Sequence, residues 1–219
     1  MEMEFLLFLQ ELHNQVLDVF FSTITRLGDG GIFWIILCLV MLCTKKYRKW
    51  GILFALSMLC CFLIGNIALK NIVARSRPCW VNPDITLLIK NPQDYSFPSG
   101  HSMISFTSAL SIWYANKKWG IAAFILASVI AFSRLYLFVH YPTDVLMGIL
   151  IGLAVSFLVH KTGEIYETKK DSMKITSYSN YFKTEPLYEM ILKEFDELDD
   201  YDMNKLQFFM TVFEEKKSS

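Results

Sequence analysis

Long runs of hydrophobic residues, separated by short polar connections, dominate the first three quarters of the chain. Five runs come close to the length of a membrane-spanning helix: residues 31–44, 51–69, 102–115, 119–138 and 145–159. Such a helix needs about 20 mostly apolar residues. Helix is the expected conformation, because backbone groups in lipid must find their hydrogen bonds within the segment. The pattern therefore predicts an all-α, polytopic membrane bundle of five to six transmembrane helices.

The segment 3–27 has a different pattern. Its apolar residues recur at roughly helical spacing, but polar residues such as Gln10, His13 and Asp18 interrupt them. This spacing predicts an amphipathic helix that lies at the membrane interface. A sixth membrane span is the alternative, and the sequence does not decide between the two.

The chain becomes polar after residue 160 and includes an acidic stretch at residues 193–202. We therefore expect two parts, a membrane domain over residues 1–160 and a polar C-terminal tail over residues 161–219. Apolar residues at helical spacing within 187–213 predict two short amphipathic helices in the tail.

The composition agrees with a membrane protein, since 53% of the residues are hydrophobic and the mean hydropathy is +0.35. The formal net charge is zero, yet the basic residues gather in the short connections 45–49 and 116–118. Short basic loops face the cytoplasm. This rule places residues 70–101 and 134–144 on the extracytoplasmic face and the tail in the cytoplasm. We expect the bilayer as a partner and no nucleic acid, while the oligomeric state is left open.

Six ionisable residues near the ends of the hydrophobic runs fall on the extracytoplasmic face of this topology. Charged groups next to membrane helices are costly to bury and are candidates for function. The six are Lys70, Arg77, His101, Arg134, His140 and Asp144. Arg75 is interpreted instead as an anchor at the membrane interface.

The spacing of these residues indicates a phosphate site. Lys70 and Arg77 are two helical turns apart and share a face if the helix continues to Arg77. Pro98 suits a first helical turn, so the backbone N–H groups of Ser99, Gly100 and His101 would form an anion site at a helix N-terminus. Three cations, with Arg134 as the third, suit a phosphoryl group better than a single carboxylate.

His140 and Asp144 are four residues apart, which allows the carboxylate to fix the tautomer of the imidazole. The other ring nitrogen then keeps a lone pair, as a nucleophile requires. His101 is available to protonate a leaving oxygen. These groups form a complete set for phosphoryl transfer through a phosphohistidine.

Three segments of this sequence resemble the motifs of the type 2 phosphatidic acid phosphatases, a family of membrane lipid phosphate phosphatases. The segments are "KNIVARSRP" (residues 70–78, K-x6-R-P), "PSGH" (residues 98–101) and "SRLYLFVHYPTD" (residues 133–144, S-R-x5-H-x3-D). All three match in order, and the resemblance covers about residues 25–160. It implies the helical core that this family shares with vanadium haloperoxidases.

The resemblance also implies a role for each matched residue. His140 would attack phosphorus, Asp144 would orient it, and His101 would protonate the leaving oxygen and later activate water. The phosphoryl oxygens would be bound by Lys70, Arg77, Ser99, Gly100 and Arg134. Neither a metal ion nor another cofactor is expected.

The chain is similar in length to bacterial members that act on undecaprenyl diphosphate or phosphatidylglycerol phosphate. Undecaprenyl diphosphate is the preferred substrate, because its recycling requires hydrolysis on the outer face, and phosphatidate is a further alternative. Three other interpretations are a transporter, a soluble haloperoxidase and an inactive lipid-binding member. The gathering of charges at one surface argues against the transporter, the five apolar runs argue against the haloperoxidase, and the complete motifs argue against the inactive member.

Overall fold

The computed structural model describes the backbone of residues 1–181 and the side chains of residues 1–173. This part of the chain consists of helices and connecting segments, without a β-strand. In chain order the α-helices are α1 (Glu2–Glu11), α2 (Gln15–Ile24), α3 (Ile32–Cys43), α4 (Arg48–Cys61), α5 (Lys70–Val73), α6 (Pro78–Val81), α7 (Gly100–Ala115), α8 (Lys117–Tyr136) and α9 (Pro142–Tyr181). Two 3-10 helices, η1 (Thr25–Gly31) and η2 (Lys45–Tyr47), and a π-helix, η3 (Phe62–Leu69), connect them. The amphipathic helices predicted within residues 187–213 lie outside the described residues.

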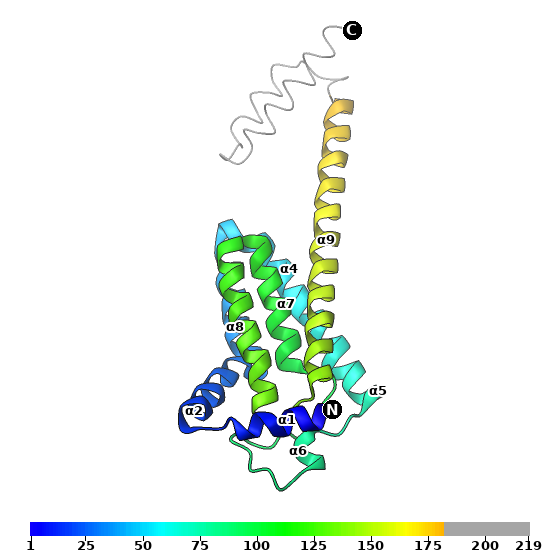
Figure 1. Ribbon diagram of the computed structural model, residues 1–219. Coiled ribbons are helices and arrows are strands. Elements are labelled where there is room, and N and C mark those ends of the chain that lie inside the picture. The colour runs from blue at the N-terminus through cyan, green and yellow to red at the C-terminus, as the bar shows by residue number, and fades with distance from the viewer. Residues whose placement is uncertain (182–219) are drawn as a thin grey trace. The chain divides into compact units, whose positions relative to one another are not determined.

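The compact unit Met1–Ile165 is a helical bundle, and its long helices α4, α7, α8 and α9 run along one another in Figure 1. Helix α7 packs on α8 and α4, and α3 packs on α4. The turn between α7 and α8 lies at the upper end of the bundle in this view, whereas α1, α5 and α6 gather at the lower end. The two ends of the bundle therefore differ, and the lower end holds the irregular segments.

Four helical stretches are long and apolar enough to cross a membrane. They are Gln15–Cys43, Lys45–Val81, Lys117–Tyr136 and Pro142–Met173. The prediction of an all-α, multi-pass membrane protein is thereby confirmed. Helix α7 has 16 residues and rises only about 24 Å, so it is shorter than these four stretches.

The N-terminal segment differs from the single amphipathic helix predicted over residues 3–27. It forms two helices, because the side chain of Asn14 accepts hydrogen bonds from the backbone of Val16 and Leu17 and so begins α2 as a new helix. Helix α1 buries Leu6 and Leu9 in the same hydrophobic cluster as Tyr136. Helix α1 is thus packed across the lower end of the bundle, while α2 continues through η1 into α3.

Small residues bring α9 unusually close to α7. A Cβ atom on Gly148 would lie 2.7 Å from the carbonyl oxygen of Ser99, and one on Gly152 would lie 2.4 Å from that of Met103. The hydroxyl of Thr107 donates to the carbonyl oxygen of Gly152 at 3.1 Å. A pair of glycines four residues apart allows such close helix packing in membrane proteins. This contact holds the start of α7 against the first turns of α9.

Helix α9 continues without interruption from Pro142 to Tyr181, so the helix does not end where the hydrophobic run ends near residue 160. The division into a membrane domain of residues 1–160 and a tail of residues 161–219 stays a prediction.

Candidate active site

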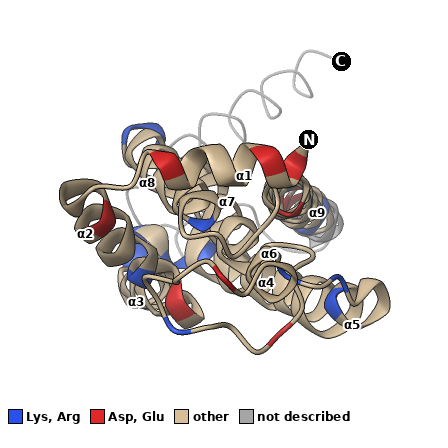
Figure 2. Ribbon diagram, turned by 60° about the horizontal axis from the view of Figure 1, so that its bottom comes forward, with Lys and Arg blue, Asp and Glu red and all other residues tan. Residues whose placement is uncertain are grey.

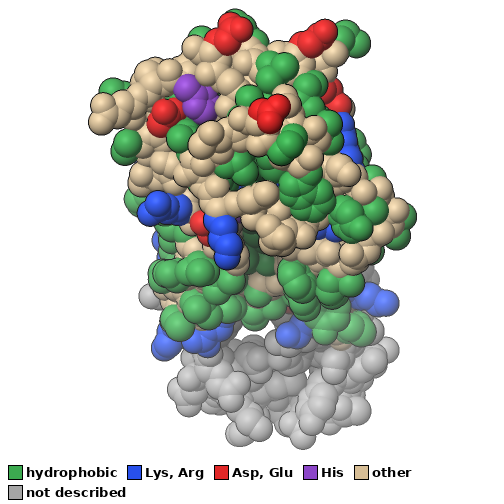
Figure 3. Space-filling view, turned by 90° about the horizontal axis from the view of Figure 1, so that it is seen from below, with side chains coloured by type: hydrophobic (Ala, Val, Ile, Leu, Met, Phe, Trp, Pro, Cys, Tyr) green, Lys and Arg blue, Asp and Glu red, His purple; other side chains and the backbone are tan. Residues whose placement is uncertain are grey.

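A cavity of about 1240 Å³ opens at the lower end of the bundle. Its polar part is lined by residues from five separate segments of the chain, among them Asp29, Lys70, Asp94, His101 and His140. Figure 2 looks toward this end and shows acidic residues on α1 and α2 and a basic residue on α5. Figure 3 shows the end in space-filling form, with charged side chains of both signs among hydrophobic ones. The cavity therefore lies where the predicted extracytoplasmic residues converge.

Lys70 and Arg77 reach the cavity from two different helices. Helix α5 ends at Val73, because Ala74 adopts a left-handed conformation with φ of 46°, and Arg77 is the N-cap of the short helix α6. The prediction that both residues share one helical face is therefore wrong. Their side chains meet nevertheless, because both form ion pairs with the carboxylate of Asp94.

Asp94 was not anticipated from the sequence. It belongs to the irregular connection between α6 and α7, and its Oδ1 accepts a hydrogen bond from Arg77 at 2.7 Å while its Oδ2 pairs with Lys70. Burial opposes ionisation, but the hydrogen bonds and charges of Lys70 and Arg77 lower the pKa of Asp94 to about 2. Two of the three cations that were predicted to bind phosphate, Lys70 and Arg77, thus already form ion pairs with a carboxylate.

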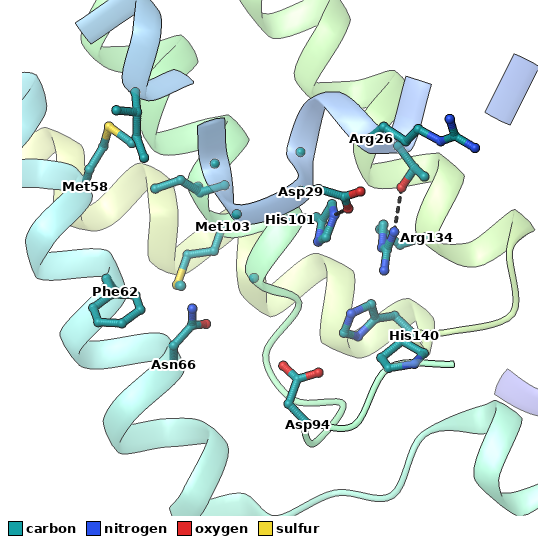
Figure 4. Close-up of a pocket in the computed structure, with 18 of the residues that line it drawn as sticks. Arg26, Asp29, Met58, Phe62, Asn66, Asp94, His101, Met103, Arg134 and His140 are labelled. Atoms are coloured by element: carbon teal, nitrogen blue, oxygen red, sulfur yellow. Dashed lines mark hydrogen bonds and ion pairs between the residues drawn. The ribbon is translucent and has the colours of Figure 1, made fainter. Parts of the chain in front are cut away.

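Arg134 is the third cation and is only 3% exposed. Its Nη1 donates to the hydroxyl of Thr25 at 2.5 Å, whereas its buried Nε has no hydrogen-bond partner. Within the described residues Arg134 forms no ion pair. A buried guanidinium with an unused donor is costly unless an anion compensates for it. Figure 4 shows Arg134 beside His101 and His140 at the cavity wall.

The hydrogen bonds of His140 define its tautomer. Its Nε2 lies 3.1 Å from Nη1 of Arg77, and a guanidinium can only donate, so Nε2 accepts and the ring proton resides on Nδ1. Burial, followed by the positive charge of Arg77, lowers the pKa of His140 well below its ordinary value. His140 is therefore neutral at physiological pH, and the lone pair of Nε2 is directed toward the cations.

Asp144 supports His140, but mainly through Ser96. The Nδ1 of His140 is 3.7 Å from Oδ2 of Asp144, too far for a hydrogen bond. The hydroxyl of Ser96 lies 3.4 Å from that Nδ1 and donates to Oδ2 of Asp144 at 2.5 Å. Ser96 and Asp144 are both completely buried. The expected pair of histidine and aspartate is thus a three-residue relay, and no sequence pattern pointed to Ser96.

Arg75 is not the isolated membrane anchor that the sequence suggested. Its Nη1 donates to Oδ1 of Asp144 at 2.6 Å, and its Nη2 donates to Glu2 at 2.7 Å. Its guanidinium also stacks 3.9 Å from the ring centre of Tyr141. Glu2 in turn accepts hydrogen bonds from the backbone and hydroxyl of Thr143. Arg75 therefore ties α1 to the buried carboxylate behind His140.

The "PSGH" segment begins α7 differently from the expectation. Helix α7 starts at Gly100 and Ser99 is its N-cap, so Pro98 precedes the helix and does not form its first turn. The backbone N–H of Ser99 donates to the carbonyl oxygen of Asp144 at 3.0 Å, and it is not available to an anion. The N–H groups of Gly100 and His101 remain at this helix start, and both residues line the cavity.

His101 lies on the opposite side of the cavity from Asp94. Its Nε2 is 2.9 Å from Oδ1 of Asp29, which belongs to η1. The positive charges of Arg134 and Arg77 lie near this imidazole, whereas the carboxylate of Asp29 is in direct contact with it. Figure 4 shows Asp29 and His101 side by side.

Together these groups offer a neutral imidazole nitrogen, three cations and a second imidazole around one cavity. These are the groups needed to transfer a phosphoryl group to a histidine. Among the side chains that the structure describes, no group of three or more His, Cys, Asp or Glu residues is placed to hold a metal ion.

Four contributors to this site were missed from the sequence, namely Asp29, Arg75, Asp94 and Ser96. A need for nearby carboxylates could have been predicted, because three clustered cations and two histidines require negative charge to balance them. The sequence does not show that Asp29 and Asp94 meet this need, because that depends on how η1 and the connection between α6 and α7 fold back on the bundle.

Comparison with known proteins gives a family for these residues. The model of the PAP2 superfamily matches residues 50–165. An undecaprenyl-diphosphatase of Sulfolobus acidocaldarius is 38% identical over 60% of this chain and 66% of its own length. The undecaprenyl-diphosphatase BcrC of Bacillus subtilis is 27% identical over 70% of this chain and 78% of its own length. Among solved structures, a PAP2-type phosphatidylglycerolphosphate phosphatase from Bacillus subtilis superposes with a TM-score of 0.62 and 28% identity, covering 74% of this chain and 84% of its own.

Proposed function

The chain belongs to the PAP2 superfamily, and we propose on this premise that it is a membrane phosphatase that hydrolyses undecaprenyl diphosphate through a phosphohistidine at His140. The observation that carries this proposal is the environment of Nε2 of His140. That atom is an unprotonated acceptor 3.1 Å from Arg77, in a cavity also lined by Lys70 and Arg134.

In the first step the lone pair of Nε2 forms a bond to phosphorus, and the bond from phosphorus to the leaving oxygen breaks. Arg77 must release Nε2 to permit this attack, and its guanidinium then binds a phosphoryl oxygen. Lys70, Arg134 and the N–H groups of Gly100 and His101 stabilise the charge on the other oxygens. The leaving oxygen takes the broken electron pair and receives a proton from His101.

The second step returns the enzyme to its starting state. His101, now unprotonated, accepts a proton from water while the water oxygen attacks phosphorus. The bond from phosphorus to Nε2 breaks, inorganic phosphate is released and His140 regains its lone pair. Ser96 and Asp144 keep the proton of His140 on Nδ1 throughout, so that Nε2 remains the reactive nitrogen.

The lining of the cavity supports a lipid substrate. Beyond the polar groups, the cavity extends along α3 and α4 past apolar residues that include Ile35, Leu39, Ala55 and Leu59. Figure 4 shows Met58 and Phe62 on this side. A phosphorylated headgroup can thus reach His140 while its hydrocarbon chain lies against the apolar wall. We also propose that α7 completes a set of five transmembrane helices, since it packs on α4 and α8 within the bundle.

The choice of undecaprenyl diphosphate rests on the relatives and on the proposed orientation. Two relatives, from Sulfolobus acidocaldarius and Bacillus subtilis, carry this activity in their names. The short basic connections 45–49 and 116–118 support a cytoplasmic location for the end of the bundle opposite the cavity. The cavity then opens on the extracytoplasmic face, and the tail after residue 160 lies in the cytoplasm. Reporter fusions after Lys117 and Lys161 test this orientation, and an external reporter at either position would contradict it.

Phosphatidylglycerol phosphate is the second candidate substrate, because the superposed Bacillus subtilis structure is a phosphatase for that lipid. Purified protein in detergent and EDTA should be given undecaprenyl diphosphate, phosphatidylglycerol phosphate and phosphatidate in parallel. We expect the fastest phosphate release from undecaprenyl diphosphate and none from the His140→Ala variant. Preference for another lipid would change the substrate assignment, whereas full activity of His140→Ala would contradict the mechanism.

A further inference from the structure

Asp29 is an acidic residue in contact with His101 that lies outside the segment matched by the PAP2 superfamily model, which begins at residue 50. Its Oδ1 lies 2.9 Å from Nε2 of His101. Both side chains line the cavity, and Figure 4 shows them facing one another. The N-terminal part of the chain therefore reaches one of the two histidines of the site.

The backbone of η1 is shaped around His101. A Cβ atom on Gly28 would lie 2.5 Å from Cδ2 of His101, so the backbone approaches this edge of the imidazole as closely as a glycine allows. Gly30 and Gly31 follow with φ angles of 58° and 69°, a conformation that favours glycine. These turns end η1 and direct the chain into α3. The Cδ2–Nε2 edge of the ring is thus covered by residues 28–29, and the Nδ1 side is the opposite one.

The contact assigns the ring protons of His101. A carboxylate accepts hydrogen bonds and does not donate them, so Nε2 carries a proton that is directed at Asp29. The Nδ1 atom makes no hydrogen bond to any residue that the structure describes. The nitrogen available for exchanging a proton with substrate or water is therefore Nδ1.

His101 needs a nearby carboxylate to exchange a proton through Nδ1, because its other neighbours disfavour the protonated imidazole. The ring is largely enclosed, and the positive charges of Arg134 and Arg77 both disfavour its protonated form. His140, the other histidine at the site, is neutral. Asp29, through its hydrogen bond and its negative charge, favours the protonated imidazole. Without Asp29, His101 would lose the one carboxylate in direct contact with its ring, while the buried guanidinium of Arg134 would remain nearby.

We propose that Asp29 is a positioning residue that holds the Nε2–H of His101, so that Nδ1 delivers the proton to the leaving oxygen and later accepts one from water. The assignment rests on the proposed phosphatase function. Asp29 does not touch the phosphoryl group in this scheme and acts only through His101. The arrangement is a second pair of histidine and carboxylate in the site, separate from His140 and Asp144.

Leaving groups of different basicity separate this role from a structural one. p-Nitrophenolate departs without a proton, whereas an alkoxide requires one. We expect Asp29→Asn to lower kcat/KM for dioctanoyl phosphatidate by about 100-fold, in the range of a general-acid contribution, and to lower kcat/KM for p-nitrophenyl phosphate less than about threefold. Asp29→Glu should restore most of the phosphatidate activity, and Asp84→Asn, which alters an exposed aspartate in the connection between α6 and α7, should match wild type on both substrates.

The two substrates also report on folding, because retained p-nitrophenyl phosphate activity shows that the variant is intact. Equal losses on both substrates, or no loss on phosphatidate, would overturn the role of Asp29. An Asp29→Asn variant without activity on either substrate counts as an equal loss. If wild-type protein hydrolyses neither ester, the phosphatase assignment itself is wrong and the role of Asp29 is lost with it.

Discussion

At the scale of single residues, Asp94 occupies the position in which an anionic substrate would meet two cations. Its carboxylate pairs with Lys70 and Arg77. With a pKa of about 2, Asp94 stays ionised at every pH suitable for an assay. A phosphoryl group must therefore displace this carboxylate or share the cations with it, and either requirement weakens binding.

Asp94→Asn should consequently strengthen the binding of small phosphate analogues. We expect the inhibition constant for orthovanadate to fall by about tenfold, which corresponds to about 1.4 kcal/mol, because the cations no longer face a competing negative charge. Inhibition of p-nitrophenyl phosphate hydrolysis by vanadate measures this constant, with Asp84→Asn as a control for loss of an exposed charge. Unchanged or weaker inhibition would show that Asp94 does not compete for the site.

Some residues of the site can be recognised from their position in the sequence, whereas others gain their role only through contacts with residues far away in the chain. Charge at the end of a hydrophobic run is unusual in itself, so six candidates could be nominated from the sequence alone: Lys70, Arg77, His101, Arg134, His140 and Asp144. Ser96 and Arg75 could not, because each gains its role from a contact with Asp144, 48 and 69 residues away. Ser99 was only partly understood, since its backbone N–H bonds to Asp144 and does not face the cavity.

At the scale of helices, the packing of α7 on α9 holds His101, at the start of α7, close to Asp144, in the first turn of α9. The N-cap of α7 and the first turn of α9 share a hydrogen bond from Ser99 to Asp144. Gly148 and Gly152 permit this approach. The hydroxyls of Ser111 and Ser156 continue the contact one to two turns further along, at 3.0 Å.

Gly152→Val should separate these helices and destabilise the protein. Its side chain would meet the carbonyl oxygen of Met103, and overpacking of this kind costs about 1–3 kcal/mol. We expect the midpoint of thermal unfolding in detergent to fall by about 2–10 °C. Ala154→Val adds bulk to an exposed position of the same helix and should leave the midpoint nearly unchanged. Equal midpoints for the two variants would argue against a tight contact at Gly152.

Hydrophobic patterning located the helices but not their interruptions. The runs 51–69 and 145–159 fall within helical stretches that are long and apolar enough to span a membrane, and the runs 31–44 and 119–138 extend past the ends of two other such stretches by one and two residues. The break before Asn14 and the end of α5 at Val73 were not predicted. Each depends on one residue, a side-chain cap at Asn14 and a left-handed backbone at Ala74, and neither changes the average hydrophobicity.

At the scale of the compact unit Met1–Ile165, the cavity is lined by charged and polar residues in one part and by apolar residues of α3 and α4 in another. The class of protein could be predicted from the sequence, since composition and run length already indicate a membrane bundle. The cavity could not, because its lining comes from segments far apart in the sequence, among them η1, α3, α4, the start of α7 and the connection between α6 and α7. Under the proposed function, this apolar wall would contact the hydrocarbon chain of a lipid, which a water-soluble phosphate ester lacks.

Leu59→Trp should therefore discriminate between substrates by chain length. Leu59 lines the cavity, and a larger side chain there would obstruct the hydrocarbon chain but not the headgroup. We expect kcat/KM for undecaprenyl diphosphate to fall by about tenfold or more, as for misfit in a hydrophobic pocket, while p-nitrophenyl phosphate is hydrolysed normally. Ile52→Trp, on the same helix but outside the cavity lining, is the matched control. Equal effects of both variants on both substrates would place the lipid chain elsewhere.

The central claim is that His140 carries the phosphoryl group during turnover. The most direct measurement is mass-spectrometric mapping of phosphate on the His101→Asn variant, quenched in alkali during hydrolysis of p-nitrophenyl phosphate. Because p-nitrophenolate leaves without a proton while hydrolysis of the intermediate needs His101, the phosphorylated enzyme should accumulate. We expect a phosphoryl adduct on the peptide that contains His140, at the histidine itself, and no adduct in His140→Gln. An adduct on another residue, or steady phosphate release by His140→Gln, would contradict this claim.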